Sequence, residues 1–408
     1  LSAGGTHAGI FVANVSTFSG NISNAGMINA HTGISIGAGV SFAGGATIVN
    51  SGTISASGAI AINASSVAAA QAVTIAVTGG TITGNIVGNG SNSTLDFALG
   101  SGKTFAYGSS FSGINQANIT SGVVVLNGSN TAAGMAVSSA GTLAGTGVIT
   151  TTNGISVAGT LEPGTPGTAG GVLTIGGNLS FASTAEYLDT ISGTTAGETL
   201  INSGTVVLGG ADVSIAGTVT AGYEYTILNT SGTISGTFNP TVTYAGGLIG
   251  EITYSANEED VYLTFLNSAG CYIGPYPHTN TFNINCMQVS GSSFSGVVGN
   301  TGTISTGGIV VTSSTINGSI VDSGVILGGG ISIDSASVII ATATAVSVTG
   351  STFVGGITNA GTISAGPVGI AVAGVVTFGG GITNSGTLSA SHTGISVSGV
   401  SNFSGGIT

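Results

Sequence analysis

An aromatic residue followed by glycine, an aliphatic residue, asparagine and a second glycine recurs along this chain. Near the C-terminus the phenylalanines of the pattern are Phe353, Phe378 and Phe403, so the interval is constant, 378 − 353 and 403 − 378 both being 25. A Gly-Ile-x-Val stretch lies between consecutive phenylalanines, as at 369–372, and in it apolar and small residues alternate. Alternation with period two predicts short β-strands, and the Asn-Ala-Gly, Asn-Ser-Gly and Gly-Gly runs between them predict corners.

A fixed period in the twenties is typical of a solenoid, in which each repeat buries its apolar side by stacking on the next. The same pattern starts from Phe18 and Phe42 at the N-terminal end. With about three strands per period, we expect an all-β fold, a right-handed parallel β-helix with rungs of about 25 residues. The chain then makes about 16 rungs, since 408/25 is close to 16.

The recurring large and amide side chains predict ladders along the axis of the solenoid. We expect the aromatic positions to stack inside the bore; they are Phe18, Phe42, Phe294, Phe353, Phe378 and Phe403. Amides about 4.8 Å apart can hydrogen-bond from rung to rung and tolerate the backbone of a corner. The corresponding asparagines are Asn24, Asn50, Asn300, Asn359 and Asn384, with Asp322 as a substitute. We interpret both sets as structural.

Changes in the repeat divide the chain into four segments. Residues 1–98 and 291–408 read as β-helix coils of the same type. Residues 99–266 keep the strand and turn signals but lose the regular period, and they hold most of the acidic residues. Residues 267–290, which include Pro275 and Pro277, interrupt the repeats and read as a loop or linker.

This loop contains both cysteines, Cys271 and Cys286. In an exported protein two cysteines this close most simply form a local disulfide, and closing such a loop contributes roughly 3 kcal/mol in the chain-entropy model. The alternative is a metal or redox pair, but the spacing is not CxxC and His278 is the one further ligand nearby.

The low content of charged residues limits the kinds of partner that the chain can bind. Only 3% of the residues are charged and the net charge is −12, with a single basic residue, Lys103. Nucleic acids and anionic membranes both require clustered Lys and Arg, so we expect neither as a partner. Gly, Ser, Thr or Asn breaks every apolar stretch before the roughly 18 to 20 residues that a spanning helix needs, so we expect no direct membrane insertion.

Several motifs in 99–266 occur in a recognisable order. They are a G-x-L-x-G-x-G turn at 141–147, a G-T-L-x-P-G corner at 159–164, GVLTIGGNLSF at 171–181, and Y-x-I-L followed by G-x-F between Tyr225 and Phe238. This stretch resembles the passenger domains of type V autotransporters, with their autotransporter-associated β-strand repeats. The flanking Asn-x-Gly-x-Ile coils are similar to those of large alphaproteobacterial β-helix surface proteins. The resemblance implies an exported stem in which 99–266 acts as a cap that aids folding.

Candidate chemistry is sparse. His7, His31 and His392 share one repeat position and would form a row able to bind a metal or sense pH, although a His at a solvated turn usually does neither. The run 258–260, Glu-Glu-Asp, suggests calcium, but a solvated hairpin turn explains it equally. Asp96, Asp322 and Asp334 occur singly, whereas polysaccharide-cleaving β-helices need converging acids or a carboxylate cluster with a base. We therefore expect no enzyme activity, no catalytic residue and no cofactor or metal.

The sequence favours a non-enzymatic, exported β-solenoid that forms a rigid filament or adhesin stalk on the surface of a Gram-negative bacterium. Four residues of the Asn-Ser-Gly-Thr type would join Thr408 to a copy beginning at Leu1, which predicts head-to-tail association or continuation in a longer chain. A glycan or protein of a host or of a cell surface is the expected receptor. Three alternatives remain: a purely structural matrix or sheath fibre, a ligand-binding or ice-binding solenoid, and a glycan-active β-helix.

Overall fold

The structure is a computed structural model that describes residues 1–408 except 44–45, 256 and 282. It confirms the expected fold class: the chain is all-β, and its parallel coils stack into a β-solenoid of about 16 turns. The chain forms two compact units. Unit 1 comprises Leu1–Val219, Tyr225–Ala245 and Ile252–Leu263, and unit 2 comprises Thr220–Glu224, Gly246–Glu251 and Thr264–Thr408. In the part of the chain that the structure describes, no helix is long and apolar enough to cross a membrane.

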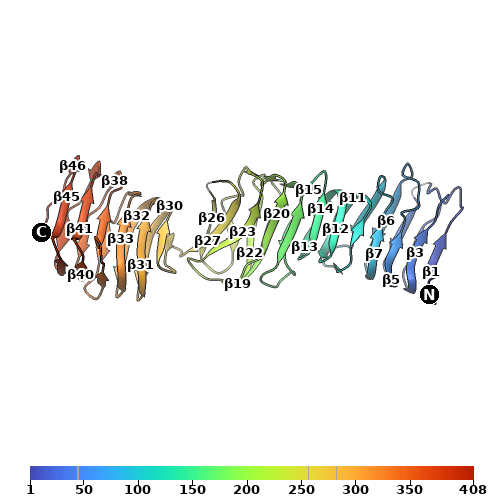
Figure 1. The fold of residues 1–408 in the computed structure, drawn as a ribbon, viewed down its shortest axis with the longest axis horizontal. Helices are drawn as coiled ribbons and strands as arrows, with labels where there is room; N and C mark the ends of the chain where they lie inside the picture. Colours follow the sequence, from blue (N-terminus) through green and yellow to red (C-terminus); the bar gives the residue numbers. More distant parts are fainter. Residues whose placement is uncertain (44–45, 256, 282) are drawn as a thin grey trace. The chain divides into compact units, whose positions relative to one another are not determined.

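In unit 1 the strands of successive coils lie side by side in columns (blue to yellow-green in Figure 1). One sheet has five strands: β1 (Ala8–Val12), β3 (Met27–Ile36), β5 (Thr53–Asn63), β7 (Thr81–Val87) and β10 (Phe111–Ser112). A second column contains β2 (Ile22–Asn24), β4 (Thr47–Asn50), β6 (Val73–Val77), β8 (Ser93–Ala98), β11 (Ile114–Leu126), β12 (Ser129–Val137), β14 (Val148–Thr151), β15 (Ile155–Val157), β17 (Val172–Gly176), β18 (Leu179–Phe181), β20 (Glu198–Ser203), β21 (Val206–Val207), β23 (Glu224–Thr230) and β24 (Ile234–Ser235). The third column shares β11 and contains β9 (Thr104–Tyr107), β13 (Gly141–Gly145), β16 (Thr160–Pro163), β19 (Glu186–Gly193), β22 (Asp212–Val219) and β25 (Val242–Tyr244). Strands β26 (Ile249–Tyr254) and β27 (Asp260–Leu266) come next along the chain.

Coil length in unit 1 differs from the uniform period that the sequence pattern predicts. Thr53 pairs with Thr81, whereas Leu143 pairs with Leu161, so the step along the sequence is 28 in the first case and 18 in the second. The strands keep their register because the alternating apolar residues still meet from coil to coil. Extra residues are accommodated at the corners, where small residues make long and short turns equally accessible.

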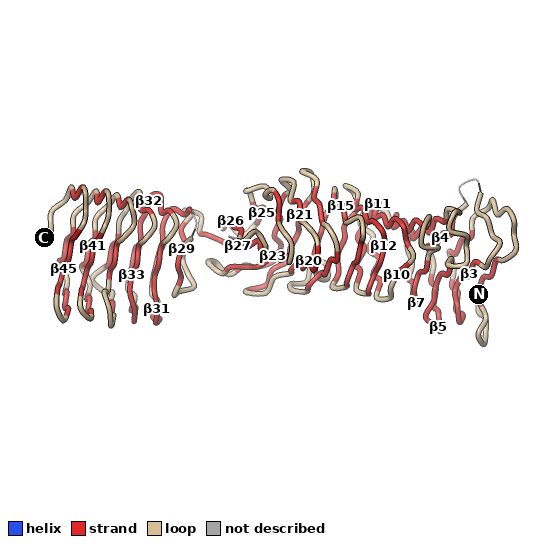
Figure 2. Tube along the Cα trace, turned by 45° about the horizontal axis from the view of Figure 1, so that its top comes forward, coloured by secondary structure: helices blue, strands red, loops and turns tan. Residues whose placement is uncertain are grey.

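In unit 2 the coils consist of two parallel sheets, whose strands follow one another from coil to coil in Figure 2. The ten-stranded sheet contains β28 (Cys271–Tyr272), β30 (Asn283–Ser290), β32 (Thr303–Thr312), β34 (Val325–Ile326), β35 (Ile331–Ile333), β38 (Thr352–Phe353), β39 (Ile357–Asn359), β42 (Thr377–Phe378), β43 (Ile382–Asn384) and β46 (Asn402–Phe403). The nine-stranded sheet contains β29 (His278–Asn280), β31 (Ser293–Asn300), β33 (Thr315–Asp322), β36 (Val338–Ile340), β37 (Val346–Val348), β40 (Thr362–Ala365), β41 (Val368–Ala373), β44 (Thr387–Ala390) and β45 (Thr393–Ser398).

The segment 267–290, which the sequence assigns to a loop or linker, is part of this stack. Its strands β28, β29 and β30 pair in parallel with β30, β31 and β32 of the following coils. The prolines that suggested a loop, Pro275 and Pro277, lie between β28 and β29, where no ladder hydrogen bond is required of them. The repeat therefore continues through this segment with different residues.

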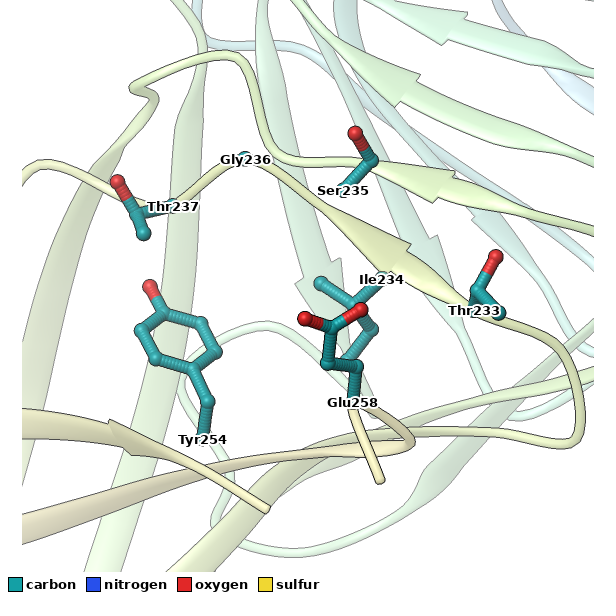
Figure 3. A pocket seen from close by; sticks show the side chains of 7 residues that line it. All are labelled: Thr233, Ile234, Ser235, Gly236, Thr237, Tyr254 and Glu258. Atoms are coloured by element: carbon teal, nitrogen blue, oxygen red, sulfur yellow. The ribbon is translucent and has the colours of Figure 1, made fainter. Parts of the chain in front are cut away.

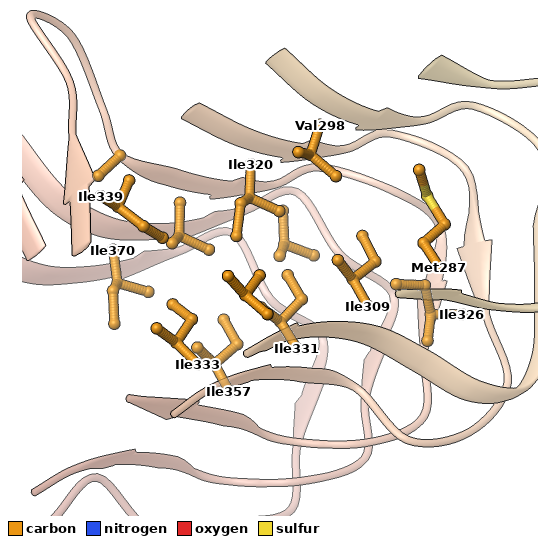
Figure 4. Close-up of a cluster of buried hydrophobic side chains, with 14 of the residues drawn as sticks. Met287, Val298, Ile309, Ile320, Ile326, Ile331, Ile333, Ile339, Ile357 and Ile370 are labelled. Carbon is orange, nitrogen blue, oxygen red and sulfur yellow. The ribbon is translucent and has the colours of Figure 1, made fainter. Parts of the chain in front are cut away.

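Rows of aliphatic side chains fill the core of unit 2 (Figure 4). Met287, Ile309 and Ile331 lie side by side on adjacent strands of the ten-stranded sheet, and the row continues to Ile357 and Ile382. The facing row from the nine-stranded sheet is Val298, Ile320, Val346 and Ile370. These side chains are at most 1% exposed. One coil contributes too few apolar residues for such a core, so the coils are stable only as a stack.

Corner glycines allow the coils to approach closely. A Cβ added to Gly52 would lie 2.1 Å from the carbonyl oxygen of Gly26, and one added to Gly80 would lie 1.9 Å from that of Gly52. Gly80 also has a φ of +75°, in the left-handed region that other residues rarely adopt. Gly52 follows the Asn50-Ser51 corner. Gly386, after Asn384-Ser385, is equally close to its neighbour, since its added Cβ would lie 2.1 Å from the carbonyl oxygen of Gly361, and these contacts explain why a glycine recurs at such corners.

Candidate functional site

In unit 1 the expected amide ladder consists of Asn24 and Asn50, which are paired in register on β2 and β4. Asn24 Nδ2 donates to Asn50 Oδ1 at 2.8 Å, and both residues are buried. Asn50 Nδ2 in turn donates to the carbonyls of Gly52 at 2.9 Å and Gly79 at 3.4 Å. The ladder ends there, because the next residue in register is Val77.

In unit 2 the asparagines occupy two different corners, although the sequence pattern suggested one. Asn300 lies on β31 of the nine-stranded sheet, where it accepts from Asn280 at 2.7 Å and donates to Asp322 at 2.7 Å. Asn359 lies on β39 of the ten-stranded sheet and donates to Asn384 at 2.7 Å. The two ladders therefore satisfy the buried amides at both ends of the sandwiched core.

The predicted aromatic row also differs between the two units. Phe353 and Phe378 are fully buried and stacked with centroids 5.0 Å apart, and the half-buried Phe403 stacks on Phe378 at 4.9 Å. Phe18 and Phe42 are half-buried and meet edge to face at 5.7 Å.

Phe294 does not belong to the Phe353 row. It lies in register with Ile316 on the nine-stranded sheet and stacks on Tyr276, with centroids 5.5 Å apart. Phe294 shares the local Phe-Ser-Gly motif of Phe403, but it follows a different corner, so its side chain enters the core from the other sheet.

Cys271 and Cys286 form a disulfide, with Cα atoms 4.5 Å apart. They are direct register partners on β28 and β30, so the bridge ties two neighbouring coils of unit 2 together. Nearby, the ring of His278 stacks on Tyr272 with centroids 3.9 Å apart, and burial lowers the pKa of His278 to about 4. This imidazole is neutral at physiological pH and acts as part of the aromatic packing.

The histidine row does not assemble a metal site. His7 and His392 are exposed, His31 is half-buried, and none is joined by further ligands. Across the described residues, no three His, Cys, Asp or Glu side chains lie close enough to hold a metal ion.

Two buried carboxyl groups in unit 1 were not anticipated from the sequence. Glu162 Oε1 accepts from the Gly167 amide at 3.1 Å, and Asp189 Oδ1 accepts from the Gly197 amide at 2.9 Å. Burial raises the pKa of both, that of Asp189 to about 7. They are 6% and 0% exposed, so a polymeric substrate cannot reach them, and their contacts are those of loop anchors.

The three carboxylates of the acidic run at 258–260 have different surroundings in the structure. Asn257 donates to the carboxylate of Glu259, while Asn229 and Tyr262 donate to that of Asp260. The hydroxyl of Ser255 stabilises the backbone of this turn, because it accepts hydrogen bonds from the amides of residues 259 and 260. The three carboxylates therefore do not converge on one calcium position, and Glu258 is left facing a different part of the surface.

Glu258 lines a hollow of about 510 Å³ in unit 1, which we call the β24 hollow (Figure 3). Its lining consists of Thr233, Ile234, Ser235, Gly236, Thr237, Tyr254 and Glu258. The hydroxyls come from exposed residues on and beside β24, the buried Ile234 lies at its base, and the Tyr254 and Glu258 side chains face β24 from the opposite side.

β24 is paired with β21 on the preceding coil, and the described residues place no strand along its other edge, where the hollow lies. Among the described residues, the backbone contact on that edge is from Ile234 N to Glu258 O at 2.9 Å. Glu258 itself has a φ of +57°, which is uncommon for a residue with a side chain and is concentrated at functional positions.

Tyr254 is poised as a hydrogen-bond donor. Its hydroxyl accepts from the Phe238 amide at 2.9 Å, which leaves the phenolic proton free to donate. Burial raises the pKa of Tyr254, so the phenol stays protonated. In the sequence only the acidic run indicated this place, since the Thr and Ser positions resemble every other outward position of the coils.

No model of a known protein family and no curated protein sequence matches this chain.

Proposed function

We propose that this chain is a non-enzymatic, exported β-solenoid that forms a rigid stalk or filament with an adhesive role at the surface of a Gram-negative bacterium, in the manner of an autotransporter passenger. The observation that carries the proposal is the continuity of side-chain rows from coil to coil. In unit 2, stacked rows of Phe, Ile and Asn side chains join successive coils, and such rows stiffen a solenoid along its coil axis, which is what a stalk requires.

The outer face of the coils supports an adhesive or surface role. Thr362 lies beside Thr387 and Ser364 beside Ser389, so the same small hydroxyl groups recur on successive coils. Weak contacts to such a periodic face add together when a partner is also repetitive. The disulfide agrees with an oxidising, extracytoplasmic compartment.

Head-to-tail association with a second copy of this chain is part of the proposal. Within unit 2, coils of one type stack in parallel and in register, as β40 does on β44 and β41 on β45. Coils of two copies that carry the same repeat could pair in the same way.

Immunogold electron microscopy tests the proposed location and form. Antibodies raised against the purified chain are applied to intact and to permeabilised cells that make the protein. Label on thin filaments or on the surface of intact cells supports the proposal. Label that appears only after permeabilisation overturns it.

A further inference from the structure

We propose that the β24 hollow binds a sugar ring of a neutral or amino-bearing glycan, which would make unit 1 a recognition module as well as a stalk. This inference rests on the proposed adhesive role and names the ligand class for it. It depends on three features of the hollow: its hydroxyl-rich wall, its aromatic ring and its unpaired carboxylate.

The wall of the hollow matches the hydroxyl pattern of a pyranose. Thr233 and Ser235 are exposed and flank the buried Ile234, so their side chains point to the same side of the strand. Thr237 follows the bend at Gly236, whose φ is +74°, and lines the hollow from beyond the end of β24. Each hydroxyl both donates and accepts, as sugar hydroxyls do. The volume of about 510 Å³ lies within the range of small-ligand sites and accommodates one or two sugar rings.

Tyr254 supplies the apolar contact that sugar recognition needs. One face of a pyranose carries C–H groups, and an aromatic ring is the side chain that best covers such a face while keeping a polar tip. Its hydroxyl lies next to Thr237, where it accepts from the Phe238 amide and can donate to a sugar oxygen (Figure 3).

Glu258 determines the charge preference. Unlike the carboxylates of Glu259 and Asp260, that of Glu258 has no hydrogen-bond partner among the described residues. A free carboxylate accepts two hydrogen bonds from vicinal hydroxyls or pairs with an ammonium group. It repels sialic and uronic acids, as does the net charge of −12.

An extended peptide fits this place less well. A peptide that added a strand to β24 would need the amide of Ile234, but Glu258 O already accepts from it at 2.9 Å. The turn that carries Glu258 is held at both ends, since its amide donates to Ser255 O at 3.0 Å. The backbone that carries Glu258 is therefore fixed, and the Ile234 amide is already occupied.

The full chain is screened against immobilised glycans ending in mannose, galactose, N-acetylglucosamine, glucosamine, sialic acid or glucuronic acid. Responding glycans are then titrated by calorimetry against the wild type and three variants. Glu258→Gln removes the free charge, Thr237→Val removes a wall hydroxyl, and Glu259→Gln is the matched control on the neighbouring carboxylate. Thermal unfolding establishes that each variant is folded.

We expect binding to neutral or amino-terminated glycans and none to the acidic ones. Glu258→Gln weakens it by about tenfold or more and Thr237→Val weakens it measurably, while Glu259→Gln leaves it unchanged. Binding that Glu258→Gln does not affect, or no binding to any neutral or amino glycan, overturns the inference. In that case surface label in the immunogold experiment still upholds the stalk, so the two failures are distinguishable.

Discussion

The side-chain amide of Asn300 donates a hydrogen bond of 2.7 Å to the carboxyl group of Asp322, and both residues are buried. Asp322 stands where an asparagine would continue the ladder, and its Oδ2 has no partner among the described residues. In unit 1, Asn50 ends its ladder by donating to the carbonyls of Gly52 and Gly79. Asp322 has the equivalent neighbours, Gly324 and Gly350, but an ionised carboxylate cannot donate to a carbonyl.

Asp322→Asn is therefore expected to stabilise unit 2 at neutral pH, by about 1 to 3 kcal/mol. Burial raises the pKa of Asp322 in the folded protein. The stability from this group is complete below its unfolded pKa of about 3.9 and is lost as the pH rises through the folded value. In urea unfolding from pH 3 to pH 8, the free energy of unfolding of the variant should increase relative to that of the wild type as the pH rises.

Asp334→Asn provides the control of opposite sign. The hydroxyl of Ser337 donates to Asp334 and lowers its pKa, so this carboxylate stabilises the fold above its unfolded pKa. The variant should lose stability at neutral pH and match the wild type in acid. Equal responses of the two variants would contradict the ladder account of Asp322.

Phe378→Ala is expected to destabilise unit 2 by about 3 to 5 kcal/mol, because the ring is fully buried between Phe353 and Phe403 and its loss leaves a cavity. Phe18→Ala is the comparison in unit 1, where the half-buried ring has one edge-to-face partner, and it should cost markedly less. Hydrogen exchange measured at increasing denaturant concentration gives the loss of unfolding free energy in each unit separately. Similar losses at both positions would contradict the difference in packing.

How far the sequence predicts this molecule depends on which contacts are local. Alternation and the constant spacing of Phe353, Phe378 and Phe403 identify the fold and the aromatic row, because stacking repeats the same local environment. The sequence does not distinguish the corner of Asn300 from that of Asn359, since Asn-x-Gly-Thr-Ile makes the same turn at either end of a sheet. The sheet to which each corner belongs depends on the number of residues between corners, which varies from coil to coil.

The β24 hollow was not predictable for a different reason. It forms where, among the described residues, β24 has no partner strand on one edge, and Tyr254 and Glu258 line it from a later part of the chain, beyond β25. No local pattern encodes such an opening. The prolines of 267–290 led us to predict a loop where the structure has strands. They mark a corner within a coil and not a break between coils.

Removal of the disulfide should weaken the first coils of unit 2. The double variant Cys271→Ser, Cys286→Ser is expected to lose about 3 kcal/mol in the chain-entropy model for a loop of this size. Alkylation of unreduced protein should label no cysteine, and alkylation after reduction should label both. Labelling of native protein without reductant would show that the bridge is absent.

Stability of unit 1 should fall as the pH rises toward 8. Burial raises the pKa of Asp189 to about 7, so its favourable contribution is complete below about pH 4 and disappears as the pH passes 7. Asp189→Asn should flatten this dependence, and Asp212→Asn, at an exposed position, should leave it in place. Unit 1 peptides in hydrogen exchange at pH 5 and pH 8 give the comparison; a slope unchanged in Asp189→Asn would refute the assignment.

Cryo-electron microscopy of the native material that this chain forms on producing cells tests the central claim most directly. If parallel coils stack into a surface stalk, the images will contain thin rods with an axial spacing of about 4.8 Å between strands, and the side-chain rows of Phe353, Phe378 and Phe403 will lie inside them. Material without that axial spacing, or with these rings facing solvent, would contradict the account.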